Sequence, residues 1–267
     1  TKDIKNIIAI ASGKGGVGKS TVAINIASEL SKSYKVGLLD LDIYGPSLPT
    51  LIGEDKVPEI KGNNLLSPIE KFGIKFMSFG FLNSNNDPAI WRGPMVSKLT
   101  HQFFDNVDWG ELDYLILDLP PGTGDIPLTL AQTIPITGIL VVTTPQDVAS
   151  NVAVKAIGMF DKLNVPILGV VENMSYFACP DCTKKHYIFG NGGAKKISEK
   201  HEIPFLGEIP LNSGIMEGSD LGKPVMMTNT ESPSADAFRI AAKNVAAQCS
   251  IVAAKLQEEI QAEATTN

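Results

Sequence analysis

The sequence is poor in cysteine and in long hydrophobic runs, and each scarcity excludes a class of protein. Its 267 residues include three cysteines. That number is too small for a disulfide scaffold, so a reducing environment is expected. The apolar runs are strand-sized, as at Gly138–Thr143, and none approaches the ~18 residues of a membrane-spanning helix. An integral membrane protein is therefore excluded.

Positive charge is also scarce. Lys plus Arg total 23 and Asp plus Glu total 29, which gives a net charge of −6. A surface that follows a nucleic-acid backbone needs clustered positive charge, so no nucleic-acid partner is expected. With 43% hydrophobic and 19% charged residues, the chain has enough apolar material for a packed core and no sign of global disorder.

The start of the chain carries no recognisable targeting segment. Thr1 is followed by an apolar run at Ile7 with no signal region between them, which predicts a cytoplasmic protein. Because Thr1 is not Met, removal of a leader stays open, and the mitochondrial matrix is then the alternative. No linker, repeat or low-complexity block interrupts the chain, so one domain is expected over residues 1–267.

Short apolar runs alternate with helix-sized segments. Strands are predicted at 7–11, 36–39, 74–79, 114–117, 138–143, 167–171 and 205–209. Helices are predicted at 19–33, 95–106, 126–132, 148–163, 193–201 and about 234–262. Most of these strands lack polar alternation, which is typical of strands buried on both faces of a parallel sheet. The order predicts an α/β fold, doubly wound, with a mainly parallel sheet and helices on both faces.

A glycine-rich loop follows the first predicted strand. It comprises Gly13, Lys14, Gly15, Gly16, Val17, Gly18, Lys19, Ser20 and Thr21, and it matches G-x-x-x-x-G-K-[ST] between a strand and a helix. The glycines let backbone N–H groups surround phosphates, and the helix N-terminus adds its dipole. We expect Lys19 to reach the β- and γ-phosphates and the Ser20 hydroxyl to ligate Mg²⁺.

A second lysine, Lys14, stands at the start of this loop. It is either an exposed loop charge or a residue that reaches the nucleotide of a second subunit, since it lies too near the loop entrance for its own phosphates. The segment GKGGVGKST resembles the deviant Walker A motif of the MinD, ParA and nitrogenase-iron-protein class, whose members sandwich two ATP molecules between facing subunits. The resemblance implies a homodimer in which Lys14 crosses the interface.

Carboxylates follow two of the predicted strands. Asp40 and Asp42 follow 36–39, and Asp118 follows 114–117, so all three are expected at the ligand edge of the sheet. Asp42 is predicted to orient the attacking water or a magnesium-bound water. Asp40 either contacts Mg²⁺ through water or caps the strand. The alternative for these two acids is a pair of solvated turn residues.

The segment that begins at Asp118 has the Walker B arrangement, in which the carboxylate holds Mg²⁺ through its water shell. It continues as Leu119-Pro120-Pro121-Gly122-Thr123-Gly124-Asp125. Such a constrained loop is expected to sense the γ-phosphate, and Asp125 is expected to be the N-cap of the next helix. With the phosphate loop, these segments predict nucleotide hydrolysis.

The sequence contains no Asn-Lys-x-Asp guanine signature. Val170-Val171-Glu172-Asn173-Met174-Ser175 follows a predicted strand instead. Resemblance to the same class implies that Asn173 reads adenine and that the Pro210 segment packs on the base. ATP is therefore the expected nucleotide.

Cys179 and Cys182 form a Cys-x-x-Cys pair in a predicted loop. This spacing lets two thiolates converge on one metal or cluster, and two facing chains would supply four thiolates to a bridging 4Fe–4S cluster or Zn²⁺. A redox dithiol and an accidental pair are the alternatives. His186 is expected to be a surface histidine rather than a zinc ligand, and Cys249 to be a small buried hydrophobe.

Together these motifs resemble the Mrp/ApbC family of iron–sulfur cluster carrier ATPases over nearly the whole chain, including Ile188-Phe189-Gly190 and Gly207-Glu208-Ile209-Pro210. The resemblance implies a homodimer with slow ATP hydrolysis. It also implies a labile 4Fe–4S cluster on the paired Cys179 and Cys182, for transfer to apo iron–sulfur proteins.

Two other functions stay open. A positioning or partition ATPase of the MinD or ParA kind would need a basic, aromatic C-terminal helix for a membrane or a basic stripe for DNA. The chain has Gln257-Glu258-Glu259-Ile260 near its end and no aromatic residue after Phe238, so neither membrane nor nucleic acid is expected as a partner. An electron-donating iron protein is less favoured, because the cysteines follow the base-reading strand rather than the switch loops.

Overall fold

The computed structural model describes residues 3–43, 45–62, 64–82, 103–179, 182 and 184–266. Its strands are β1 (Ile4–Ser12), β2 (Val36–Asp40), β3 (Ile69–Lys71), β4 (Ile74–Ser78), β5 (Leu112–Asp118), β6 (Gly138–Thr143), β7 (Ile167–Glu172), β8 (Phe177–Ala178), β9 (Lys185–His186) and β10 (Phe205–Glu208). Its helices are α1 (Lys19–Leu30), α2 (Leu48–Ile52), α4 (Asp125–Thr133), α5 (Asp147–Lys162), α6 (Gly193–His201), α7 (Ser213–Asp220), α8 (Val225–Thr228) and α9 (Pro233–Thr266), with a short 3₁₀ helix, η1, at Phe79–Phe81.

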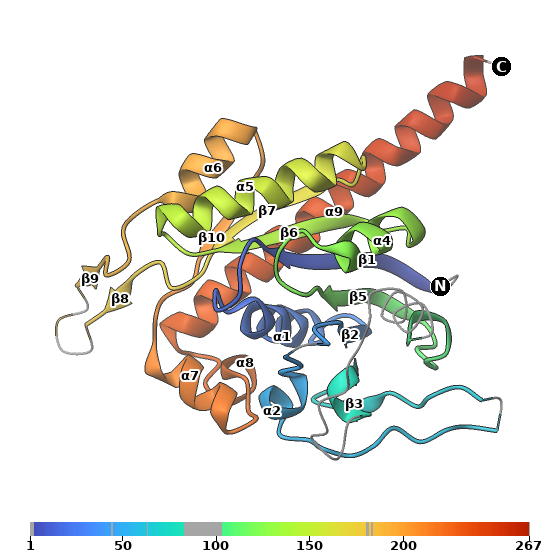
Figure 1. The fold of residues 1–267 in the computed structure, drawn as a ribbon, viewed down its shortest axis with the longest axis horizontal. Coiled ribbons are helices and arrows are strands. Elements are labelled where there is room, and N and C mark those ends of the chain that lie inside the picture. Colours follow the sequence, from blue (N-terminus) through green and yellow to red (C-terminus); the bar gives the residue numbers. More distant parts are fainter. Residues whose placement is uncertain are drawn as a thin grey trace.

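The main sheet has the strand order β10-β7-β6-β1-β5-β2-β4-β3, and all its pairs are parallel except β3–β4. Helices α1, α8 and α9 cover one face, and α4, α5 and α6 cover the other (Figure 1). Alternate residues of β1 enter different cores: Ile8 and Ile10 pack with α1 and α9, whereas Ile7 and Ala9 pack with α4 and α5. The predicted doubly wound α/β fold is confirmed.

The long apolar segments were predictable because both of their faces are buried. Each predicted strand is present, with ends that differ by up to three residues, and the predicted helix 19–33 ends at Leu30. Most of the predicted helix 95–106 lies outside the described residues, and within its described part Phe103–Asp105 are helical. The short elements β3, α2, α7, α8, β8 and β9 were not predicted, because tertiary contacts rather than periodicity hold them.

One such contact anchors α8. The backbone N–H of Met226 donates to the Asn25 side chain of α1 at 3.1 Å, and Met226 is fully buried. An element of four residues gains little from its own hydrogen bonds, so its position depends on this partner.

Helix α9 packs along the sheet and then extends beyond the body of the protein (Figure 1). Its first half buries Phe238, Val245 and Cys249, whereas Ile251 and Leu256 are exposed. Burial raises the pKa of the Cys249 thiol to about 12, which confirms the prediction of a small buried hydrophobe. Within the described part of the chain, every helix is too short or too polar to cross a bilayer.

Helix α9 is bonded to the outer strand of the sheet, β10. The Asn244 side chain of α9 donates a hydrogen bond to the Leu206 carbonyl at 2.9 Å.

Candidate functional site

The glycine-rich loop connects β1 to α1, and its glycines are required for two different physical reasons. Gly18 is the N-cap of α1 with φ of 79°, and a Cβ there would lie 2.2 Å from Asn173 Nδ2. A Cβ on Gly13 would lie 2.4 Å from the Val152 backbone in α5. Gly18 therefore permits a left-handed turn against the Asn173 side chain, and Gly13 lets the loop pack tightly on α5.

Lys19 begins α1 and lies in a buried ion pair. Its Nζ is 2.5 Å from Asp118 Oδ1 and 3.5 Å from Ser20 Oγ. The Asp118 carboxylate and the Ser20 hydroxyl thus face one cation, at the ends of β5 and the phosphate loop. The structure brings these three sequence-predicted residues together.

Asp40 lies beside this pair, because Asp40 on β2 and Asp118 on β5 are register partners. Its Oδ1 accepts the Asp42 backbone N–H at 3.0 Å. Its Oδ2 accepts the Ser78 hydroxyl at 3.0 Å and the Leu48 N–H at 3.3 Å. Asp40 is 1% exposed, so the alternative of a solvated turn acid is wrong for it. It caps its strand and fixes the loop that carries Asp42, which is itself half-buried.

Burial, reinforced by the negative charge of Asp118, raises the pKa of the Asp40 carboxyl from its ordinary value of 3.8 to about 7. The reason is that two buried carboxylates share one lysine, so one of them is favoured in its protonated form. In the folded protein Asp40 therefore binds a proton over a pH range in which the unfolded chain has released it.

This proton makes stability depend on pH. Between 3.8 and about 7 the Asp40 carboxyl binds a proton in the folded state that the unfolded state has released. The contribution of this carboxyl to the free energy of unfolding therefore falls as pH rises, by up to about 1.4 kcal/mol per pH unit. Asp40→Asn removes the titrating group, so the pH dependence of stability should lose this falling component. Urea unfolding across the range measures the effect. Asp105→Asn, at an exposed position, should keep the wild-type slope, and an unchanged slope in Asp40→Asn would contradict the assignment.

Lys14 contacts the connection between β6 and α5. Its Nζ lies 3.5 Å from Gln146 Oε1, which also accepts the Thr144 hydroxyl at 3.1 Å. Gly15 and Gly16 beside it are exposed. The Lys14 side chain is thus half-buried against the β6–α5 connection, next to the exposed part of the phosphate loop.

Asp125 was expected as the N-cap of α4, and this prediction is wrong. The N-cap is Gly124, and Asp125 is the first helical residue. A carboxylate in the first turn interacts favourably with the helix dipole. Asp125 therefore still stabilises the N-terminus of α4, by its charge rather than by a capping hydrogen bond.

The loop after β7 joins the phosphate loop. The Asn173 side chain is buried, and its Nδ2 donates to the Val17 carbonyl at 2.8 Å. Asn173 and Pro210 lie in one pocket of about 230 Å³. This pocket is lined by Gly18, Thr21, Asn173, Met174, Pro210, Leu211, Asn212, Ile215, Met216, Ser219 and Asp220. The α7 part of this lining was not predicted from the sequence, although the Asn212 N-cap, which accepts the Gly214 N–H at 2.8 Å, was a signal for that helix.

The structural role of Glu172, at the end of β7, was not predicted from the sequence either. It is fully buried, and its carboxylate accepts the Ser175 hydroxyl at 2.6 Å and the Ala194 N–H of α6 at 2.7 Å. A buried carboxylate satisfied in this way holds the turn around Asn173 against the start of α6.

The two cysteines lie on a hairpin that follows this turn. β8 and β9 pair Phe177 with His186 and Ala178 with Lys185, and the Cys179 N–H donates to the Lys184 carbonyl at 3.1 Å. The hairpin projects from the body (Figure 1), with Cys179 half-buried and Cys182 and His186 exposed. Among the described residues, no group of three or more His, Cys, Asp or Glu side chains converges on a metal position.

The hairpin is tied to the pocket by main-chain bonds. The Leu211 N–H donates to the Tyr176 carbonyl at 2.8 Å, and the Ser175 N–H donates to the Ile209 carbonyl at 2.9 Å. The segment that leads to Cys179 therefore runs beside the segment that contains Pro210. A displacement of the segment around Pro210 would therefore also displace the base of the hairpin.

The fold and the phosphate loop define a P-loop NTPase. Among solved structures, the chain is similar to the nucleotide-binding protein of Archaeoglobus fulgidus in complex with ADP, with a TM-score of 0.77, 41% identity and coverage of 89% of this chain and 93% of that one. It also shares its fold with MinD of Pyrococcus horikoshii complexed with Mg-ADP, with a TM-score of 0.67, 23% identity and coverage of 90% and 96%.

The family can be stated more closely. The ParA model described as NUBPL iron-transfer P-loop NTPase matches residues 3–246, and the chain belongs to this family. It is 49% identical over 252 residues to the iron-sulfur cluster transfer protein NUBPL of Dictyostelium discoideum, covering 93% of this chain and 78% of that protein. It is also 49% identical to the iron-sulfur cluster carrier protein of Aquifex aeolicus, covering 90% and 67%. The resemblance inferred from the motifs is confirmed.

Proposed function

We propose that this chain is an ATP-hydrolysing iron–sulfur cluster carrier. Two copies bind a 4Fe–4S cluster between them and transfer it to apo iron–sulfur proteins. The observation that carries the proposal is the attachment of the Cys179–Cys182 hairpin to the nucleotide pocket, through the main-chain bonds of Tyr176 and Ser175. The names of the Dictyostelium and Aquifex relatives support the same cargo.

The phosphate loop binds ATP in this proposal. Lys19 leaves Asp118 for the β- and γ-phosphates, and the loop N–H groups and the α1 dipole hold the same oxygens. The Ser20 hydroxyl and the Asp118 carboxylate already face one ammonium group, at 3.5 and 2.5 Å. Hard oxygen donors of this kind fit Mg²⁺, which would neutralise phosphate charge, and Asp42 is proposed as a further oxygen donor to it. Asp42 is proposed to orient the attacking water.

The homodimer completes the site. Lys14 lies on the outward surface of the loop, with its Nζ at Gln146 rather than inside its own phosphate cradle. We assign it to the nucleotide of the facing copy, where a cation stabilises charge that develops during phosphoryl transfer.

The cluster is the cargo of the proposed dimer. Each chain supplies the Cys179 and Cys182 thiolates, and a cubane cluster takes four. The projecting hairpin lets a second copy approach and leaves room for an acceptor. A bridging Zn²⁺ would use the same ligands. The proposed location is the cytoplasm, with the mitochondrial matrix as the alternative because an Arabidopsis relative, 46% identical, is named a mitochondrial protein.

Asn173 is proposed to select adenine. Since its Nδ2 is held by the Val17 carbonyl, its Oδ1 is the atom left to accept the adenine amino group, which guanine lacks at that position. Asn173→Ala should weaken ATP binding about tenfold and leave the weaker GTP binding nearly unchanged. Titration with fluorescent ATP and GTP analogues measures the ratio. An equal loss for both nucleotides would mean that Asn173 only supports the phosphate loop.

The deciding experiment is cluster transfer. Protein reconstituted anaerobically with iron and sulfide is mixed with an apoenzyme that needs a 4Fe–4S cluster, and the enzyme activity should appear faster than with free iron and sulfide. Transfer that is no faster than from the free salts would reject the carrier function.

A further inference from the structure

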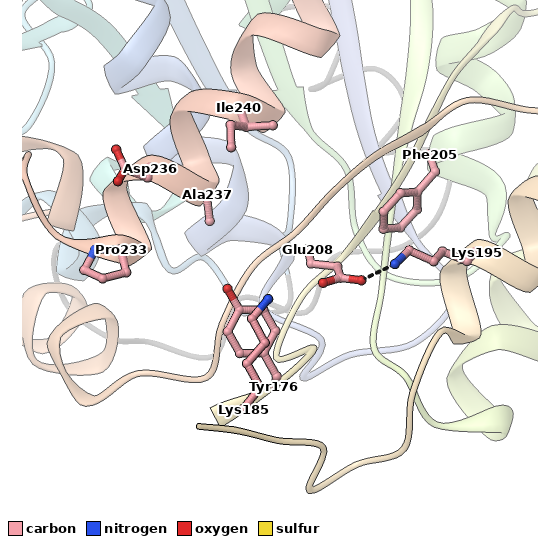
Figure 2. Close-up of a pocket in the computed structure, with 9 residues that line it drawn as sticks. All are labelled: Tyr176, Lys185, Lys195, Phe205, Glu208, Pro233, Asp236, Ala237 and Ile240. Atoms are coloured by element: carbon pink, nitrogen blue, oxygen red, sulfur yellow. Dashed lines mark hydrogen bonds and ion pairs between the residues drawn. The ribbon is translucent and has the colours of Figure 1, made fainter. Parts of the chain in front are cut away.

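A pocket of about 440 Å³ lies beside the cysteine hairpin, at the outer edge of β10 (Figure 2). Its walls come from the hairpin, α6, β10 and the start of α9. The lining residues are Tyr176, Lys185, Lys195, Phe205, Glu208, Pro233, Asp236, Ala237 and Ile240. Its volume falls in the range of pockets that bury a side chain or a small ligand. Nothing in the proposed ATP cycle uses it.

The pocket borders the strands of the hairpin that carries the two cysteines. Lys185 is the register partner of Ala178, the residue before Cys179, and its Nζ lies 3.8 Å from the centre of the Tyr176 ring. A molecule seated against Tyr176 and Lys185 would therefore lie next to the hairpin that carries the thiols.

Unpaired lysines lie at the rim of the pocket. The two acids of the lining are paired, Glu208 with Lys195 at 2.6 Å and Asp236 with Arg239. Within the described residues, no carboxylate forms an ion pair with the exposed Lys184 or Lys185 of the hairpin. These two ammonium groups are therefore available to a negatively charged partner.

The pocket also offers apolar surface. Ile240 of α9 is 56% exposed, and Figure 2 shows it on the α9 side of the pocket, with the Phe205 ring and Lys195 on the other side. Positive charge around an aromatic and aliphatic hollow fits a segment that combines acidic residues with one large apolar side chain.

We propose that this surface, termed the hairpin patch and formed by Tyr176, Lys184, Lys185, Lys195, Phe205 and Ile240, docks an acidic segment with one aromatic side chain on the protein that receives the cluster. The inference rests on the proposed carrier function for the identity of that partner. The acid contacts the lysines, the aromatic ring enters the pocket, and the acceptor is held beside Cys179 during transfer.

The test uses the full chain in a Cys179→Ala/Cys182→Ala background, so that binding is measured without any cluster. The probe is a fluorescein-labelled peptide of glutamate and glycine with one central tryptophan, followed by anisotropy. Lys184→Glu/Lys185→Glu should weaken its binding about tenfold. Ile240→Gln, or serine in place of the tryptophan, should weaken it as well. The matched control Lys162→Glu/Lys255→Glu reverses two exposed lysines elsewhere and should bind like the parent.

Three results would overturn the proposal. The first is equal binding by the patch and control variants. The second is tighter binding of a thymine oligonucleotide than of the acidic peptide, which would make the patch a nucleic-acid surface. The third is loss of the dimer in sedimentation for the patch variant alone, which would make it a self-interface. If the peptide binds but the wild type takes up no cluster, the carrier function is rejected, whereas the hairpin patch is still a docking surface for acidic segments.

Discussion

Cys179→Ala/Cys182→Ala is expected to abolish iron uptake in anaerobic reconstitution, whereas the wild type should take up about four irons per dimer. The reason is that alanine offers no ligand, and the two thiols are half of the proposed four-sulfur set. Iron and sulfide analysis with the absorbance of the brown chromophore measures the result. ATP affinity should be unchanged, because the phosphate loop is separate from the hairpin tip.

The third cysteine provides the control for this experiment. Cys249 is 1% exposed in α9, and its thiol pKa is raised to about 12, so it offers no thiolate to a cluster. Cys249→Ala should retain the full iron content. Equal iron in the double variant and the wild type would remove the cluster site from the hairpin.

Lys19→Ala should lower the rate of ATP hydrolysis by a factor on the order of 10²–10³ or more, because it removes a cation aimed at the transferring phosphate. Steady-state phosphate release measures the loss. The variant also leaves Asp118 beside Asp40 without their shared ammonium group. Its stability should therefore fall at neutral pH and fall less in acid, where protonation relieves the repulsion.

A matched lysine distinguishes this effect from a general loss of charge. Lys32 pairs with Glu29 at the partly exposed end of α1, at 2.6 Å, and such pairs contribute little to stability. Lys32→Ala should hydrolyse ATP and unfold like the wild type. Normal turnover by Lys19→Ala would exclude the proposed hydrolytic mechanism.

Much of the fold could be predicted because its strands have one simple property. The segments 36–39 of β2, 114–117 of β5 and 138–142 of β6 are apolar and buried throughout, so length and hydrophobicity suffice to locate them. The phosphate loop was predictable for another reason, since its chemistry fixes the spacing between Gly13 and Lys19.

The rest of the site depends on contacts that sequence spacing does not reveal. Asp40 is held by Ser78, 38 residues away, and by Leu48, which is why a strand cap could not be separated from a magnesium contact. Glu172 appears as a polar residue after a strand, and only its bond to Ala194 of α6 explains its burial. One wall of the pocket that contains Asn173 and Pro210 belongs to α7, whose eight residues include two glycines and show no clear helical pattern.

The contact between Asn173 and the turn at Gly18 has a consequence for divergence within the family. The amide that bonds Val17 occupies the space that a Cβ at position 18 would need, so a side chain at position 18 requires a smaller residue at position 173. Under the proposed role of Asn173 in adenine selection, relatives that have lost the glycine at position 18 should therefore have lost that selection as well.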